Sequence, residues 1–267
     1  MLNVLLELAD HLTLTISGGS GGVQLSMSGG AVGQIPSDRK NLCVRAAEAL
    51  LHSTNRQDLD VSILLEKQIP AGGGFGGGSS NAATVLSVLH KQLGEPLTKE
   101  ELFKIALSLG ADVPYFLSGS STVRVHGIGE QLSVERANYL RGLPVLLVLG
   151  LPHLSTADVF REAACSSEVQ FAPSQPTTSF PDTYPNLLEI IENDLEGPAT
   201  SLCPPLLHLL TELRSLRCGV IGMTGSGSGL FVLPKNSAGF EGHEIESVRN
   251  CTKMHGVELV QSAVVSV

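Results

Sequence analysis

Aromatic residues are scarce in this sequence, and tryptophan is absent. Phenylalanine and tyrosine make up only 4% of the 267 residues, so few side chains are available to stack on nucleic-acid bases. The formal net charge of −9 would also repel a polyanionic backbone. We therefore expect neither DNA nor RNA as the main partner, although backbone N–H groups can still hold a single small anion.

Cysteine is also sparse, with five residues scattered along the chain and none at Cys-x-x-Cys spacing. The histidines show neither His-x-x-His nor His-Glu-x-x-His spacing, so the sequence carries no zinc or redox motif. Such cysteines are typical of buried thiols in a reducing compartment. No secretory signal opens the chain, and no stretch approaches the ~18 apolar residues of a membrane span. We expect a cytoplasmic protein without a membrane segment. Its oligomeric state does not follow from the sequence.

The length of the chain suits one large domain or two modest ones. Apolar periodicity predicts strands over 4–8, 12–16, 23–27, 61–65, 123–125, 145–149, 220–221 and 230–233, and helices over 41–51, 82–89, 102–109 and 205–216. Thr98 and Glu101 have the form of a capping box ahead of the third of these helices. Positions 165–185, rich in Ser, Thr, Pro and Gln, predict a long surface loop. Adjacent strands with helices between them favour an α+β fold, with a domain boundary near 137–142.

The most informative segment is a glycine-rich loop at positions 70–83. It reads Pro-Ala-Gly-Gly-Gly-Phe-Gly-Gly-Gly-Ser-Ser-Asn-Ala-Ala. Glycines allow several N–H groups to turn toward one ligand. The apolar stripe that follows predicts a helix, and Ser79, Ser80 and Asn81 suit its start. A glycine nest at a helix N-terminus binds phosphate, whereas a flexible linker would not open straight into such a helix.

Two common phosphate motifs do not fit this loop. It lacks the Gly-Lys-Ser/Thr ending of a P-loop. Gly72, Gly74 and Gly77 satisfy Gly-x-Gly-x-x-Gly, but six glycines in seven positions make that match almost unavoidable. The acidic residue that a dinucleotide-binding fold places after its second strand would here fall in a turn between helices, at 94–96.

The loop closely resembles the phosphate-binding loop of the GHMP small-molecule kinases. Three further segments resemble that family in the same order: Gly-Ala-Asp-Val-Pro-Tyr-Phe at 110–116, Pro-His-Leu-Ser-Thr-Ala-Asp-Val-Phe at 152–160, and Gly-Met-Thr-Gly-Ser-Gly-Ser-Gly at 222–229. They are most similar to the isoprenoid-pathway branch, whose members phosphorylate a cytidine-diphosphate-linked methylerythritol at its 2-hydroxyl. The resemblance spans roughly the whole chain from Leu2.

The resemblance implies a two-domain fold and a set of site residues. Residues 1–140 would form a ribosomal-protein-S5-like α/β domain that binds ATP, and 141–267 a ferredoxin-like α+β domain. The implied phosphate-binding residues are Pro70, Gly72, Gly73, Gly74, Gly76, Gly77, Gly78, Ser79 and Ser80. Ser79 or Ser80 is the candidate ligand of Mg²⁺, which prefers oxygen donors.

The implied catalytic residue is Asp112, which would accept the proton of the attacking substrate hydroxyl. The implied substrate-binding residues are Thr156, Phe160, Thr224, Gly225, Ser226 and Gly227. Phe160 would stack on the cytosine ring. Without the resemblance these residues have ordinary explanations: a turn cap or a partner for a cation at Asp112, a core position at Phe160, a helix-start hydroxyl at Thr156 and a tight hairpin at 224–229.

The sequence departs from the family pattern at its start. These kinases open with a Pro-Ala-Lys-x-Asn strand, followed by a Tyr-His pair that grips the cytosine, and this chain has no match to either segment. If the chain starts at Met1, we expect Asp112 to lack its cationic neighbour, which in the family is the lysine of this strand. We also expect an exposed strand edge and severely reduced activity.

Two alternatives remain open on these observations. The chain is a GHMP kinase for another substrate, such as homoserine or mevalonate, or it is a nucleotide-binding protein of low activity. A cytidine site needs an aromatic wall, so Phe160 and Thr156 favour the cytidine-linked substrate over the first alternative.

Overall fold

The computed structural model describes residues 1–29, 35–165 and 180–265, and these form two compact units. The first unit contains 1–71 and 76–135, and the second contains 72–75 and 136–267. The glycine-rich loop is therefore divided, because its first glycine triplet belongs with the C-terminal part of the chain. The family domains predicted for 1–140 and 141–267 stay a prediction.

The first unit contains a three-stranded sheet with β4 (Leu59–Lys67) at its centre. β2 (His11–Gly18) pairs antiparallel with β4, and β3 (Val23–Gly29) pairs parallel with it. Alternate residues of β4 are buried, which gives the sheet one apolar face. The strands predicted over 12–16, 23–27 and 61–65 are confirmed.

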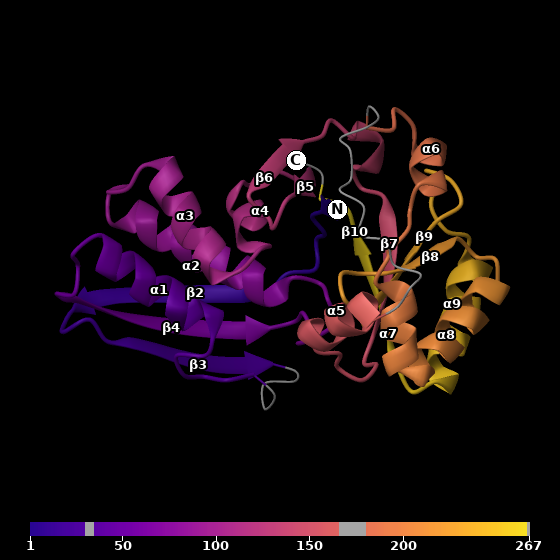
Figure 1. Cartoon of the computed structure of the whole chain (residues 1–267), viewed down its shortest axis with the longest axis horizontal. Coiled ribbons are helices and arrows are strands. Elements are labelled where there is room, and N and C mark those ends of the chain that lie inside the picture. The colour runs from indigo at the N-terminus through magenta and orange to yellow at the C-terminus, as the bar shows by residue number, and fades with distance from the viewer. Residues whose placement is uncertain (30–34, 166–179, 266–267) are drawn as a thin grey trace. The chain divides into compact units, whose positions relative to one another are not determined.

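Helices cover the apolar face of this sheet (Figure 1). α1 (Leu42–Ser53) and α2 (Gly77–Gln92) pack on the strands, and α3 (Lys99–Leu109) packs on both helices. α3 begins with the predicted capping box, in which the hydroxyl of Thr98 accepts from the backbone N–H of Glu101 and the Glu101 carboxylate accepts from the backbone N–H of Thr98.

A second sheet of the first unit has the order β1-β5-β6, and all its pairs are antiparallel. Its strands are β1 (Leu2–Val4), β5 (Thr122–His126) and β6 (Gln131–Val134). The strand predicted over 4–8 is wrong, because β1 ends at Val4, opposite Thr122, where its partner β5 begins. The short α4 (Val113–Leu117) lies before β5 in the chain.

The second unit contains a four-stranded antiparallel sheet with the order β10-β7-β9-β8. Its strands are β7 (Pro144–Leu149), β8 (Val220–Met223), β9 (Leu230–Leu233) and β10 (Glu258–Ala263). The predicted strands over 145–149, 220–221 and 230–233 are confirmed. A short 3₁₀ helix, Asn138–Leu140, precedes β7.

Helices pack on this sheet through one apolar cluster (Figure 1). They are α5 (Thr156–Cys165), α7 (Glu196–Leu202), α8 (Pro204–Ser215) and α9 (Gly242–Met254). The prediction of a helix over 205–216 is confirmed by α8. Within the described residues, no helix is long and apolar enough to cross a membrane.

Most of the loop predicted over 165–185 lies outside the described residues, at 166–179. At its end the prediction is wrong, because α6 (Tyr184–Glu189) already includes Tyr184 and Pro185. The hydroxyl of Thr183 caps this helix, and a proline in the first turn removes only an N–H that has no partner within a helix.

Candidate active site

The first half of the glycine-rich loop is held against the loop that joins β8 to β9, inside the second unit. The carbonyl of Gly74 accepts a 3.0 Å hydrogen bond from the hydroxyl of Thr224. The carbonyl of Gly73 accepts from the backbone N–H of Gly229 at 3.2 Å. Gly74 has φ +74°, and a Cβ there would collide with the carbonyl oxygen of Thr224. Two motifs that are 150 residues apart in the sequence therefore lie in backbone contact.

The second half of the loop begins α2 inside the first unit. Gly76 is the N-cap residue with φ +70°, and its carbonyl accepts from the backbone N–H of Ser80 at 2.8 Å. The expected helix start at 79–81 is thus too late, because glycine at 76 supplies the turn that precedes the helix. N–H groups at 77–79 have no partner within the helix, and its first turn carries no acidic side chain. This end of α2 fits an anion such as a phosphate.

A buried carboxylate connects the start of the loop to α2. Asp10 accepts hydrogen bonds from the backbone N–H groups of Gln68 and Ile69 at 2.7 and 2.8 Å, and from the side-chain amide of Asn81 at 2.8 Å. It also pairs with the ammonium group of Lys67. Burial opposes ionisation, but these hydrogen bonds hold the pKa of Asp10 below its usual range. The carboxylate thereby fixes three segments of the chain at once.

Asp112 lies immediately before α4, in the same unit as the start of α2. Its side chain makes no capping hydrogen bond to α4, so the turn-cap explanation is wrong. Burial raises the pKa of its carboxyl above the ordinary value. α4 packs on α2, and a Cβ at Gly76 would meet the ring of Phe116.

The two predicted substrate segments meet within the second unit. The hydroxyl oxygens of Thr156 and Ser226 are 2.9 Å apart. The side-chain amide of Asn193 donates to the carbonyls of Met223 and Gly225, both at 2.8 Å. The Thr156–Ser226 contact holds the 224–229 loop against the start of α5, and the Asn193 bonds hold it against the segment that precedes α7. The hairpin explanation of 224–229 is also correct, because the loop joins the antiparallel strands β8 and β9.

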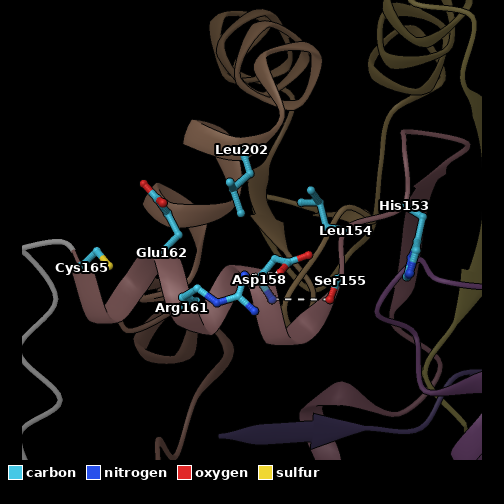
Figure 2. A pocket seen from close by; sticks show the side chains of 8 residues that line it. All are labelled: His153, Leu154, Ser155, Asp158, Arg161, Glu162, Cys165 and Leu202. Carbon is cyan, nitrogen blue, oxygen red and sulfur yellow. Dashed lines mark hydrogen bonds and ion pairs between the residues drawn. The ribbon is translucent and has the colours of Figure 1, made fainter.

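Phe160 is not a core residue, because it is 49% exposed. Thr156 and Phe160 are four residues apart and therefore share one side of α5. A different side of the helix lines a cavity of about 370 Å³ (Figure 2). The cavity residues are His153, Leu154, Ser155, Asp158, Arg161, Glu162, Cys165 and Leu202. Arg161 pairs with Asp158 at 2.6 Å there, so part of the polar lining is already neutralised.

Comparison with known proteins identifies the family. The pattern described as "GHMP kinases N terminal domain" matches residues 41–120, which run from the N-cap of α1 to just past α4. A protein from Desulfotalea psychrophila named 4-diphosphocytidyl-2-C-methyl-D-erythritol kinase is 36% identical over 237 residues, covering 87% of this chain and 76% of that protein. This chain belongs to the GHMP kinase family. A protein of the same name from Geobacter sp. strain M21 is 37% identical over 222 residues, covering 80% of this chain and 75% of the relative.

Solved structures agree with this membership. A crystal structure of 4-(cytidine 5'-diphospho)-2C-methyl-D-erythritol kinase has a TM-score of 0.66 and 29% identity, covering 97% of this chain and 87% of its own. Homoserine kinase from Cytophaga hutchinsonii has a TM-score of 0.63 at 14% identity, covering 96% of this chain and 86% of its own. The second similarity shows the shared fold alone. The predicted α+β GHMP kinase fold is confirmed.

Some residues that shape the site of this GHMP kinase were missed in the sequence. Asp10 lies between two strand patterns, and no spacing links it to its partners 57 to 71 residues away. Asn193 lies in no motif. His153 was seen only as part of a family segment, yet its ring nitrogen Nδ1 lies 3.3 Å from the carbonyl of Gly72. The available signal for Asp10 was a carboxylate directly before a strand.

Proposed function

We propose that this GHMP kinase transfers the γ-phosphoryl group of ATP to the 2-hydroxyl of 4-diphosphocytidyl-2-C-methyl-D-erythritol, in the non-mevalonate route to isoprenoid precursors. The similarity to kinases named for this substrate carries the proposal, because it reaches 36% identity over 87% of the chain. The similarity to homoserine and mevalonate kinases lies between 12% and 16% identity. That level supports only the fold, so the cytidine-linked substrate is the stronger candidate.

The glycine-rich loop is the proposed binding site for the ATP phosphates. The N–H groups at 77–79, which have no partner within the helix, and the positive end of the α2 dipole would face the negative charge. The bonds from Thr224 and Gly229 to the first glycine triplet support this role, because they hold the loop in one conformation before ATP binds. Pro70 belongs to the same proposed site and leads from β4 toward the glycines.

Mg²⁺ is the proposed metal ion of the reaction. The hydroxyls of Ser79 and Ser80 fit it chemically, since both are half-buried oxygen donors in the first turn of α2. When bound with ATP, Mg²⁺ would neutralise part of the phosphate charge. Either serine is a candidate ligand.

Asp112 is the proposed general base. An ionised carboxylate only accepts hydrogen bonds, so it can orient the substrate hydroxyl and take its proton as the oxygen attacks phosphorus. Burial and the lack of a capping role support this assignment. Its raised pKa brings the carboxyl closer to the pH at which a base is most effective.

The cytidine-linked substrate is proposed to bind along α5 and the 224–229 loop. The exposed ring of Phe160 is free to stack on a base, and Thr156, Thr224 and Ser226 supply hydroxyls. Gly225 and Gly227 would let the substrate approach the backbone closely. We further propose a cytoplasmic location, which the five free cysteines support.

The test measures ADP release by the chain of residues 1–267 with ATP, Mg²⁺ and the diphosphocytidyl polyol. We expect release to depend on the polyol, to yield a 2-phosphate by phosphorus NMR, and to fall about 10²- to 10⁴-fold in Asp112→Asn. Homoserine and mevalonate serve as matched acceptors and should give only the blank rate.

Two outcomes would overturn the proposal. Faster ADP release with homoserine or mevalonate would assign a different substrate. ATP binding without release on any of these acceptors would favour the nucleotide-binding alternative. Measuring ATP affinity by calorimetry alongside the assay separates these two results.

A further inference from the structure

A second cluster of ligand-type side chains lies between α8 and α9 in the second unit. Glu212 comes from α8, Cys251 from the last turn of α9, and His255 from the C-cap position of α9. The ring nitrogen Nε2 of His255 is 2.9 Å from the carboxylate oxygen Oε2 of Glu212. The thiol sulfur of Cys251 is 3.9 Å from the same oxygen. All three ligand atoms lie within 4.8 Å of one another.

These separations are close to those around a tetrahedral zinc ion. Zn–S bonds of about 2.3 Å and Zn–N or Zn–O bonds of about 2.0–2.2 Å place neighbouring ligand atoms roughly 3.4–3.6 Å apart. Shifts of a few tenths of an ångström would bring the Glu212–His255 and Glu212–Cys251 distances into that range, and the third separation, between Cys251 and His255, is no more than 4.8 Å. Glu212 can make these shifts, because its side chain is 51% exposed and can change conformation.

The donor set selects the class of metal. Thiolate and imidazole are preferred by Zn²⁺ and related transition metals, whereas Mg²⁺ and Ca²⁺ prefer oxygen ligands only. Two of the donors come from one helix end at a spacing of four residues, so α9 presents both on the same side. Buried leucines of α8 and Val248 of α9 belong to one core cluster, which holds the two helices, and so the backbone of all three donors, in a fixed relation.

We propose that Glu212, Cys251 and His255 form a binding site for Zn²⁺ or a similar transition-metal ion, with water as the fourth ligand. Binding displaces the thiol proton of Cys251 to solvent and leaves a metal–thiolate bond. Without a metal, burial and then the neighbouring Glu212 raise the pKa of this thiol. A bound cation reverses the second effect, because it places positive charge between the two groups. The ion would join α8 to the end of α9.

The test adds Co²⁺, a spectroscopic probe of zinc sites, to the chain of residues 1–267. We expect sulfur-to-cobalt charge-transfer absorption that is removed by an equimolar amount of Zn²⁺ and unaffected by excess Mg²⁺. Cys251→Ser should lose this absorption, and Cys165→Ser, which removes the exposed cysteine of α5, should keep it. His255→Ala should weaken Co²⁺ binding about tenfold or more, while His208→Ala on α8 should not.

A buried cysteine variant can fail to fold, so Glu212→Gln provides a second test at an exposed position. It should also weaken Co²⁺ binding about tenfold or more. Zn²⁺ should raise the melting temperature of the unmodified chain and leave that of Glu212→Gln nearly unchanged. The proposal is overturned if no charge-transfer band forms, or if Glu212→Gln and His255→Ala bind Co²⁺ as tightly as the unmodified chain. None of these readouts depends on kinase activity.

Discussion

Asp10 and Lys67 form a buried ion pair at the point where β4 leads into the glycine-rich loop. The two side chains are 0% and 5% exposed, respectively. A buried pair of this kind need not add net stability, but removing one partner leaves the other charge uncompensated in the interior. The hydrogen bonds from Gln68, Ile69 and Asn81 make the arrangement specific to one loop conformation.

Asp10→Asn should therefore destabilise the chain by about 3–5 kcal/mol, because the ammonium group of Lys67 loses its counter-charge. Urea unfolding followed by circular dichroism measures the change. Asp58→Asn is the matched control, since the Arg56–Asp58 pair is exposed, and its unfolding midpoint should not move. An equal effect of the two substitutions would contradict the role assigned to Asp10.

The destabilisation by Asp10→Asn should depend on pH with a defined sign. The pKa of Asp10 is lower in the folded chain than in the unfolded one, so ionisation stabilises the fold. This contribution is fully present above the unfolded pKa of about 4 and is lost as the pH falls through the lower folded value. The difference in unfolding free energy between the unmodified chain and Asp10→Asn should shrink over that range. A constant difference down to the lowest pH would show that charge is not the cause.

Gly74→Ala should weaken ATP binding by the glycine-rich loop more than the strain of a positive φ alone would. A Cβ at this position collides with the carbonyl of Thr224, and the positive φ adds strain. Gly94→Ala is the matched control, since it has φ +80° and open space around its Cβ position. We expect kcat/KM for ATP to fall about 10- to 100-fold in Gly74→Ala and to stay unchanged in Gly94→Ala. Equal kinetics in both variants would argue against a preformed loop.

Phe160→Ala should weaken binding of the cytidine-linked substrate without unfolding the chain. Loss of a base–aromatic contact of ~1–3 kcal/mol corresponds to a rise in KM of roughly 5- to 150-fold. The KM for ATP should not change. Leu207→Ala, at a residue of similar exposure on α8, should alter neither constant. A similar rise in KM for both substrates would point to a structural effect of Phe160→Ala instead.

The features predicted from the sequence are those that local residues determine. Apolar periodicity located most strands and helices, and the Thr98–Glu101 capping box appears as expected. The glycine-rich loop was recognised because its glycines are consecutive. The start of α2 was placed too late in the sequence, because Ser79, Ser80 and Asn81 are residue types that favour the N-cap position. In the structure, Gly76 is the N-cap residue and has a positive φ.

The features missed from the sequence depend on distant partners. In the sequence, Asp10 is an ordinary polar residue between two predicted strands. Its role depends on Lys67 at the end of β4 and Asn81 in α2, which contact it only in the folded chain. The glycine-rich loop is divided between the two units because its first glycines contact Thr224 and Gly229. These contacts join distant parts of the sequence, so no local pattern predicts them. The Cys251–His255 spacing of four residues matches no common zinc motif, and only the packing of α8 brings Glu212 to it.

The burial of Asp112 has consequences for catalysis and for stability. Its pKa is raised by burial, so the ionised form that can accept a proton is disfavoured in the folded chain. The kcat/KM profile should therefore fall on the acid side at a higher pH than an ordinary aspartate would give. This acid limb should be absent from the residual activity of Asp112→Asn.

The same burial makes a prediction that needs no substrate. A raised pKa means that ionised Asp112 costs stability at neutral pH, and that this cost disappears as the pH falls below the unfolded pKa. Asp112→Asn should therefore be more stable than the unmodified chain at neutral pH, and the gain should vanish in acid. Thermal unfolding at neutral and acid pH measures both values. A variant that is less stable at neutral pH would show that the carboxylate is held by favourable contacts, and would remove the physical basis for its role as a base.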